Sequence, residues 1–217
     1  MIFEDRQEAG RQLALALADY KDSNAIVLAL PRGGVVVGYE VAKALHLQLD
    51  VVITRKVGAP GNPEYAIGAV SETGDVQLND EEIAYLGIPS SYVKEEVAQQ
   101  HREIARRAQL YRGGRPLPEL RGRPVIVVDD GIATGFTMLA TVRALRSRQP
   151  SQLVVAVPVA PPSTVASLEA EVDKVVCLYT PEPFMAVGAW YRNFEQVTDD
   201  EVRGYLQSFR GGPATRQ

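Results

Sequence analysis

The sequence contains one cysteine and two histidines, which limits the chemistry open to it. The lone Cys177 excludes an intrachain disulfide, and its place in the apolar run 175–178 favours a small buried thiol over a nucleophile. His46 and His101 are too few for an all-protein zinc site, and each is expected on a helix face without a catalytic role. We therefore predict neither thiol chemistry nor an all-protein zinc site.

Long apolar runs and an excess of positive charge are also missing. No apolar stretch in the 217 residues is long enough to cross a bilayer, and the polar start, MIFEDRQEAG, is unlike a signal peptide. The formal net charge of −4 disfavours a nucleic-acid or anionic-membrane surface. We expect a cytoplasmic protein that binds anions only at a local site.

Hydrophobic residues make up 46% of the chain, enough for an ordinary core. We expect one domain over residues 1–210 and a frayed tail over 211–217. Short runs rich in β-branched residues alternate with helical patterns, and they cover residues 24–30, 49–54, 125–128, 153–159 and 174–178. This alternation predicts an α/β fold in which helices cover both faces of a parallel sheet. Ligands of such sheets bind beyond the carboxyl ends of the strands.

Residues 57–88 are rich in glycine and proline, which distinguishes this stretch from the rest of the sequence. Within it, residues 66–70 and 76–78 predict a β-hairpin across a turn at 71–75. A long glycine- and proline-rich stretch inside a compact domain is often a mobile functional loop, which we place at about 57–80. Its candidates to reach a ligand are Asn62, Glu64 and Tyr65.

The most specific motif is Val125-Ile-Val-Val-Asp-Asp-Gly-Ile-Ala-Thr-Gly-Phe-Thr137. A buried strand delivers two carboxylates to its carboxyl end, and a loop with two glycines and two threonines then enters a helix. The glycines permit close backbone approach, and free N–H groups at the helix start form a phosphate cradle. Carboxylates repel a phosphate, so they are suited to accept hydrogen bonds from a diol or to hold a divalent metal. A phosphate beside a diol indicates a ribose 5-phosphate.

This motif resembles the phosphoribosyl pyrophosphate (PRPP) motif of type I phosphoribosyltransferases. The resemblance implies a five-stranded parallel Rossmann-like core, a flexible β-hairpin loop and a small C-terminal hood, here about 179–197 with an N-terminal contribution. It implies that Asp129 and Asp130 bind the ribose 2′- and 3′-hydroxyls. The 5′-phosphate would be held by Gly131, Ile132, Ala133, Thr134, Gly135 and Thr137. Some 6-oxopurine enzymes of the family carry an aspartate at the position of Ala133. Its absence here weakens the assignment of hypoxanthine or guanine as the acceptor.

Pro31-Arg32-Gly33-Gly34 follows the first predicted strand and resembles the pyrophosphate loop of the family. Arg32 supplies a fixed charge, the two glycines expose N–H groups to the leaving group, and a non-proline cis peptide is expected at Pro31–Arg32. Arg55 and Lys56 end the second predicted strand, where the family often places basic residues against pyrophosphate. A solvated basic pair explains them equally well.

Residues 179–193 resemble the hood that receives the acceptor base. A planar base needs an aromatic or apolar face to stack on, and Phe184 and Val187 are the predicted base-binding residues. Tyr191 is a weaker candidate, and Trp190 is expected to pin the segment to the core instead. The resemblance does not identify the acceptor, and a homodimer is expected only by analogy with the family.

The family resemblance implies Mg²⁺-dependent transfer of a 5-phosphoribosyl group from PRPP to a nucleobase-like acceptor, with release of pyrophosphate. Mg²⁺ would be held mostly by substrate oxygens and water. Asp129, Asp130 and Arg32 are the predicted catalytic residues, acting by positioning and charge. A PRPP- or nucleotide-sensing regulator that lost catalysis remains the alternative. A dinucleotide-dependent oxidoreductase is rejected, because Gly33–Gly38 lacks the G-x-G-x-x-G spacing.

Overall fold

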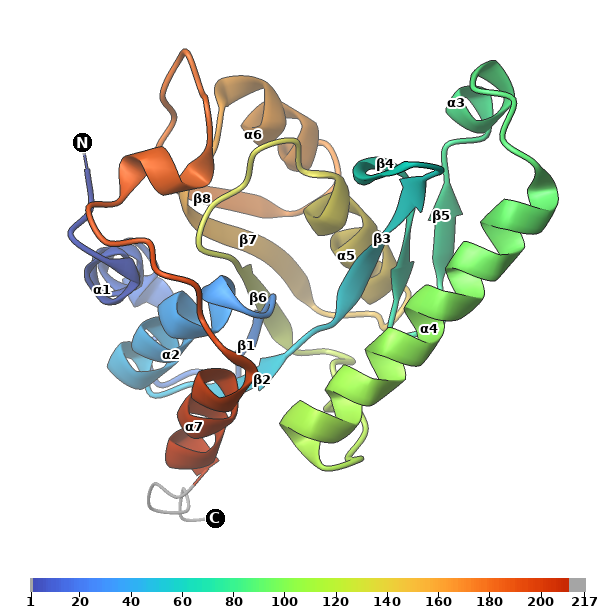
Figure 1. Ribbon diagram of the computed structural model, residues 1–217. Coiled ribbons are helices and arrows are strands. Elements are labelled where there is room, and N and C mark those ends of the chain that lie inside the picture. The colour runs from blue at the N-terminus through green and yellow to red at the C-terminus, as the bar shows by residue number, and fades with distance from the viewer. Residues whose placement is uncertain (1, 211–217) are drawn as a thin grey trace.

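The computed structural model describes residues 2–210 and contains two separate sheets (Figure 1). The larger sheet has five parallel strands in the order β2-β1-β6-β7-β8. Their bounds are Gln48–Val51 (β2), Ile26–Ala29 (β1), Pro124–Val128 (β6), Gln152–Val159 (β7) and Lys174–Tyr179 (β8). The five predicted strands and their parallel arrangement are therefore confirmed.

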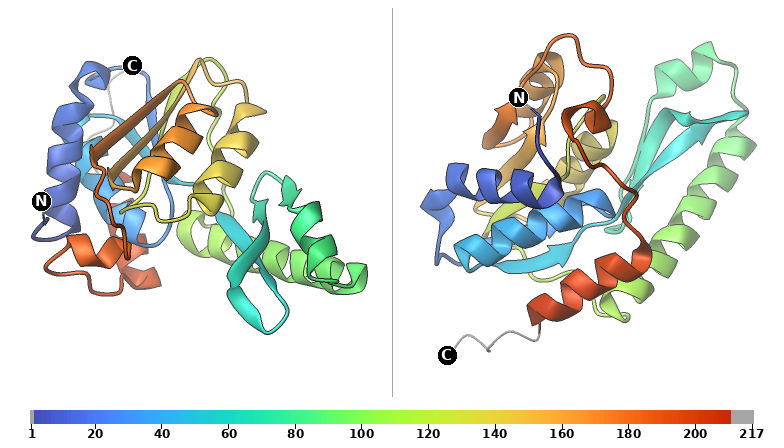
Figure 2. Two further views of the ribbon diagram at one scale, coloured as in Figure 1. Left: turned by 90° about the horizontal axis from the view of Figure 1, so that it is seen from above. Right: turned by 60° about the vertical axis from the view of Figure 1, so that its left-hand side comes forward.

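Helices cover both faces of this sheet, because its central strands are buried on both sides. One face packs against α1 (Arg6–Ala16) and α2 (Gly33–Leu45), and the other against α5 (Phe136–Arg146) and α6 (Pro162–Glu169) (Figure 2). Alternate residues of β6 divide between the two cores: Ile126 belongs to the α1–α2 side and Val127 to the α5–α6 side. Such continuous apolar strands are typical of parallel sheets.

A projecting part of the chain, residues 54–112, holds the smaller sheet, and we call it the arm. It contains β3 (Thr54–Ala59), β4 (Asn62–Ser71), β5 (Val76–Leu78), α3 (Asp80–Tyr85) and the long helix α4 (Ser90–Arg112). The predicted hairpin is confirmed, since Val70 of β4 pairs with Val76 of β5. Figures 1 and 2 show the arm standing away from the larger sheet. Its regular strands occupy the stretch predicted as a mobile loop, and its movement stays a prediction.

The N-terminal residues lie beside the segment that follows β8. Phe3 forms a parallel β-bridge with Tyr191 and donates a hydrogen bond from its N–H to the Trp190 carbonyl (2.9 Å). The short helix η2 (Val187–Trp190) follows β8, and the last helix, α7 (Asp199–Arg210), packs against α2 and α4. A further short helix, η1 (Ala18–Tyr20), follows α1. Phe3 therefore pairs with the segment predicted as the hood, and the predicted tail at 211–217 lies outside the described residues.

The Cys177 thiol donates to the Tyr179 carbonyl (3.2 Å), and burial raises the pKa of this thiol, so Cys177 stays neutral. Among residues 2–210, no helix combines the length and the apolar character that crossing a membrane requires.

Candidate active site

The candidate site lies where β1 and β6 run side by side. The chain leaves β1 toward α2 on one face of the sheet and leaves β6 toward α5 on the other. Ligands of parallel sheets bind beyond the strand ends at such a topological switch point. Residues 31–34 follow β1 and residues 129–135 follow β6, so the fold brings the two predicted ligand loops together at this edge of the sheet.

Two glycines allow these loops to touch. A Cβ atom on Gly33 would overlap the Oδ2 atom of Asp130 and lie 2.7 Å from its Cγ. A Cβ on Gly34 would lie 2.9 Å from the Cα of Asp129. Real Cβ atoms do not approach other atoms this closely, so only glycine fits at Gly33 without a shift of the carboxylate. The acid pair and the 31–34 loop therefore form one contiguous surface.

The two acidic side chains are half-buried, and Asp130 is held by a cation from the N-terminal helix. Arg6 donates from Nε to Asp130 Oδ2 (2.7 Å) and from Nη1 to the Glu195 carbonyl (2.8 Å), and its guanidinium stacks 3.8 Å from the Phe194 ring centroid. Asp129 accepts a hydrogen bond from the N–H of Asp130 (2.8 Å). These contacts fix the direction of the Asp130 carboxylate.

Burial dominates the electrostatics of this pair. Burial raises the pKa of Asp129 well above its ordinary value, and the charge of Asp130 adds to this shift. The pKa of Asp130 is also raised by burial, but Arg6 opposes the shift. The Tyr191 hydroxyl donates to the Asp130 carbonyl (2.5 Å), and burial followed by the Asp130 charge raises its own pKa. Arg6 is therefore the cation that favours an ionised Asp130.

The loop after the acid pair leads into the N-terminus of α5 and leaves its polar groups available. Gly135 has φ +79°, a left-handed conformation that starts the helix without a side-chain cap. Within residues 2–210 nothing accepts a hydrogen bond from the N–H groups of Ala133, Thr134 or Gly135. The hydroxyls of Thr134 and Thr137 have no partner in the same part of the chain. Free N–H groups at a helix start are suited to bind a phosphate.

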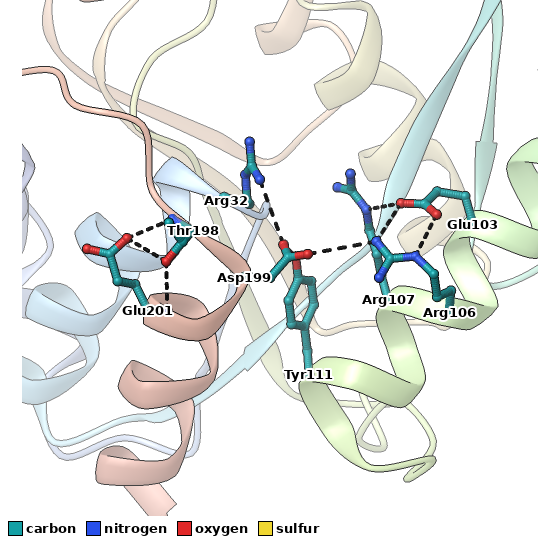
Figure 3. A network of polar contacts seen from close by, with 8 residues as sticks. All are labelled: Arg32, Glu103, Arg106, Arg107, Tyr111, Thr198, Asp199 and Glu201. Carbon is teal, nitrogen blue, oxygen red and sulfur yellow. Dashed lines mark hydrogen bonds and ion pairs between the residues drawn. The ribbon is translucent and has the colours of Figure 1, made fainter.

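Arg32 lies at the start of α2, and the peptide bond between Pro31 and Arg32 is cis, as the family resemblance implies. The Nη1 atom of Arg32 lies 4.0 Å from the Oδ1 atom of Asp199, the first residue of α7. The same carboxylate accepts a hydrogen bond from the Tyr111 hydroxyl (2.5 Å) and lies 3.8 Å from Nη2 of Arg106 on α4 (Figure 3). Arg32 therefore points toward the space between α7 and the arm.

The structure corrects the expected place of Arg55 and Lys56. The second strand of the larger sheet ends at Val51, and both residues lie inside β3, paired with Val70 and Ala69 of β4. Arg55 donates from Nε to Gln100 Oε1 on α4 (3.0 Å). It lines a cavity of about 350 Å³ together with Gln99, Gln100, Arg102, Glu103 and Arg106. A role against pyrophosphate stays a prediction for both residues.

The loop candidates of the arm lie in or beside β4. Tyr65 donates its hydroxyl to Glu82 of α3 (2.6 Å), and this hydrogen bond is the main cause that raises its pKa. Asn62 is exposed at the start of β4, and only the backbone of Glu64 is described. In this conformation Tyr65 is therefore engaged inside the arm.

The two predicted base-binding residues occupy different positions in the hood. Phe184 lines a cavity of about 510 Å³, whose other walls are Ala133, Thr134, Pro161, Pro162, Ser163, Pro181, Glu182, Pro183 and Met185. Val187 instead packs on the acid-pair loop, because a Cβ on Gly131 would lie 2.5 Å from its Cγ1 atom. Trp190 stacks against Tyr179 and Phe184 with centroids 5.2 and 6.2 Å away, which agrees with an anchoring role.

The chain belongs to the phosphoribosyl transferase domain family, whose sequence model matches residues 4–187. A protein of solved structure from Thermus thermophilus, TT1426, is 47% identical, with a TM-score of 0.82 over 96% of this chain and 99% of that one. A protein of Mycobacterium tuberculosis, provisionally named phosphoribosyl transferase Rv0571c, is 45% identical over 205 residues. This match covers 94% of the chain but 46% of that protein, so the chain spans about half the length of the curated relatives it matches.

More distant structures share the fold alone. The purine phosphoribosyltransferase of Pyrococcus horikoshii is 15% identical, with a TM-score of 0.50 over 89% of this chain and 92% of that one. Its likeness supports the type I phosphoribosyltransferase fold and says nothing of the acceptor.

Sequence reasoning missed Arg6 and Asp199. Arg6 contacts a carboxylate 124 positions away, and Asp199 lies at a helix start, where an acidic residue is ordinary. No local pattern marks either residue, because each contact depends on how α1 and α7 pack against the sheet. Correlated changes between Arg6 and Asp130 in related sequences are the signal that would reveal the first pair.

Proposed function

We propose that this chain transfers a 5-phosphoribosyl group from PRPP to a nucleobase-like acceptor and releases pyrophosphate. The observation that carries the proposal is the contact between the Asp129–Asp130 pair and the glycines of the 31–34 loop. A diol-binding acid pair, a phosphate cradle and a cationic loop then lie together at one edge of the sheet. These are the groups needed by a ribose that carries a 5′-phosphate and a 1′-pyrophosphate.

The proposed reaction forms a bond from an acceptor nitrogen to C1′ and breaks the C1′–O bond, whose electron pair leaves with pyrophosphate. Asp129 and Asp130 bind the 2′- and 3′-hydroxyls and offset the positive charge that develops on the ribose. Arg32 and the N–H groups of Gly33 and Gly34 bind the departing pyrophosphate. Residues 131–137 bind the 5′-phosphate and fix the position of the sugar.

Mg²⁺ is part of this proposal, as the family implies. Among the described residues no group of three histidine, cysteine or acidic side chains is arranged to hold a metal ion. The acid pair offers oxygen ligands, which Mg²⁺ prefers, and the remaining positions suit substrate oxygens and water. The residues present therefore fit an ion that arrives with PRPP, where it would offset the charge of the pyrophosphate.

The cavity lined by Phe184 is the proposed acceptor site. Its volume of about 510 Å³ is within the range of small-molecule sites, and one wall is formed by Ala133 and Thr134 of the phosphate loop. An acceptor in this cavity would lie beside the proposed phosphate site. Val187, which packs on Gly131, would hold the loop between the two.

Calorimetric titration with PRPP and Mg²⁺, followed by a screen of nucleobases for pyrophosphate release, tests the proposal. We expect saturable binding near one PRPP per chain and turnover with at least one acceptor. Asp130→Asn keeps the shape of the side chain, and we expect it to abolish measurable turnover while the melting temperature confirms a folded protein. Full turnover by this variant would remove the role given to Asp130.

The titration also separates the enzyme from the alternative function. Binding of PRPP without turnover across a broad acceptor screen would favour a PRPP-sensing regulator on the same fold. Absence of PRPP binding by folded protein would refute both.

A further inference from the structure

The carboxylate of Asp199 lies between two guanidinium groups that come from opposite sides of one gap. Arg32 of the pyrophosphate loop is 4.0 Å away on one side, and Arg106 of α4 is 3.8 Å away on the other. Figure 3 shows Asp199 pointing from the start of α7 into the space between these two arginines. An anion provided by the protein itself therefore stands in a position that two cations share.

The helix does not need Asp199 for its cap. Thr198 accepts a hydrogen bond at its Oγ1 from the Glu201 N–H (3.2 Å), and Glu201 accepts one at Oε2 from the Thr198 N–H (2.7 Å). This reciprocal pair is a capping box, which satisfies the helix start by itself. Removing the charge of Asp199 is therefore compatible with an intact α7.

The ion pairs of Asp199 are also weak enough to be exchanged. Its side chain is 30% exposed, that of Arg106 is 54% exposed, and both N–O separations are near the limit of an ion pair. Exposed pairs of this kind contribute little to stability. A polyvalent anion with several oxygens can approach both guanidinium groups within hydrogen-bond distance, whereas the Asp199 carboxylate stays 4.0 and 3.8 Å from them.

Charge in the gap favours such an anion. Arg32, Arg106 and Arg107 carry positive charge, and Asp199 and Glu103 carry negative charge. Glu103 is committed to the two arginines of α4, and hydrogen bonds from Arg106 and then Arg107 lower its pKa to about 2. If Asp199 leaves, the group keeps an excess of positive charge that faces the pyrophosphate loop.

We propose that the carboxylate of Asp199 holds, in the free protein, the position that pyrophosphate takes in the complex, which makes Arg106 a further pyrophosphate-binding residue. This inference rests on the proposed function, because Arg32 must contact pyrophosphate. Binding then requires the Asp199 side chain to turn away, so that pyrophosphate bridges the 31–34 loop and α4. Asp199 thereby lowers the affinity for pyrophosphate and favours its release.

Titration of the full chain with magnesium pyrophosphate tests this inference with a matched pair of variants. Asp199→Asn removes the competing charge and keeps an oxygen for Tyr111, and we expect it to tighten binding about two- to five-fold, the range of an exposed ion pair. Asp200→Asn removes the same charge one residue later, where the side chain is 89% exposed and pairs with Arg203. We expect its affinity to equal that of the wild type. Arg106→Gln should weaken binding, and Arg106→Lys should restore part of the loss.

The outcomes distinguish failure of this inference from failure of the proposed function on which it rests. If wild-type protein binds pyrophosphate and Arg32→Gln weakens binding, but Asp199→Asn equals Asp200→Asn, the place assigned to Asp199 is wrong and the function stands. Wild-type affinity in a folded Arg106→Gln variant would overturn the role of Arg106. If the wild type binds no pyrophosphate, or Arg32→Gln leaves binding unchanged, both the inference and the pyrophosphate loop fail.

Discussion

Replacing Gly33 with alanine tests the contact between the two ligand loops directly. The added Cβ would overlap Asp130 Oδ2 and lie 2.7 Å from Cγ of Asp130 and 2.8 Å from Nε of Arg6. The added atom therefore meets both partners of the Arg6–Asp130 ion pair. Either the Asp130 carboxylate turns away from Arg6 or the start of α2 moves off the sheet.

The expected free-energy change has two opposing parts. Alanine is favoured over glycine inside a helix by about 1 kcal/mol, and Gly33 is the first residue of α2. Overpacking a buried site costs about 1–3 kcal/mol. The Arg6–Asp130 pair is partly buried, so weakening it adds about 1–2 kcal/mol, between the values of exposed and buried pairs. We therefore expect a net destabilisation of about 1–4 kcal/mol, because the steric cost exceeds the gain in helix propensity.

Gly204→Ala is the matched control. Gly204 lies within α7, and a Cβ there would meet nothing within 4 Å. The same substitution should therefore stabilise the protein by about 1 kcal/mol. Urea unfolding of both variants measures the difference, which we expect to be about 2–5 kcal/mol. If Gly33→Ala is as stable as Gly204→Ala and binds PRPP as the wild type does, the proposed contact between the loops is wrong.

Three further substitutions probe the acid pair and the phosphate loop. Arg6→Met leaves the half-buried Asp130 without its cation and should lower the free energy of unfolding in urea by about 1–2 kcal/mol; a change under about 0.5 kcal/mol would contradict a partly buried pair. Asp129→Asn should gain stability over the wild type as pH rises above the ordinary aspartate range, because a raised folded pKa makes the ionised wild type less stable there; parallel stability curves from about pH 4 to 8 would argue against the shift. Thr137→Val should weaken PRPP binding about ten-fold in calorimetry with an unchanged melting temperature, because its hydroxyl has no partner in residues 2–210; equal affinity would remove Thr137 from the site.

The larger sheet could be predicted from the sequence because each strand is buried on both faces. Val125–Val128 is fully enclosed, and a run of this kind has few alternatives to a central parallel strand. The acid pair and the phosphate loop follow directly from that strand, so their place at its carboxyl end was also predictable. Local sequence is therefore sufficient to predict a site that is formed by one strand and the loop that follows it.

The misplaced pair Arg55-Lys56 shows where this reasoning stops. The apolar run continues through Val52 and Ile53, which are both buried, although the strand of the larger sheet ends at Val51. Hydrophobicity does not mark the point at which a buried chain passes from one sheet to another. Contacts between distant segments, such as Arg6 with Asp130, cannot be predicted for a related reason. They arise from the packing of whole elements, which no local pattern in a single sequence indicates.

The long helix α4 gives the arm a mechanical connection to the candidate site. Its 23 residues form a rod about 35 Å long, which packs against β3 and β4 and presents Arg106 and Tyr111 to Asp199. A rod of this kind acts as a lever, because a tilt at the outer end displaces the inner end. If the arm moves as predicted, a change in its angle would therefore change the separation of Arg106 from Arg32.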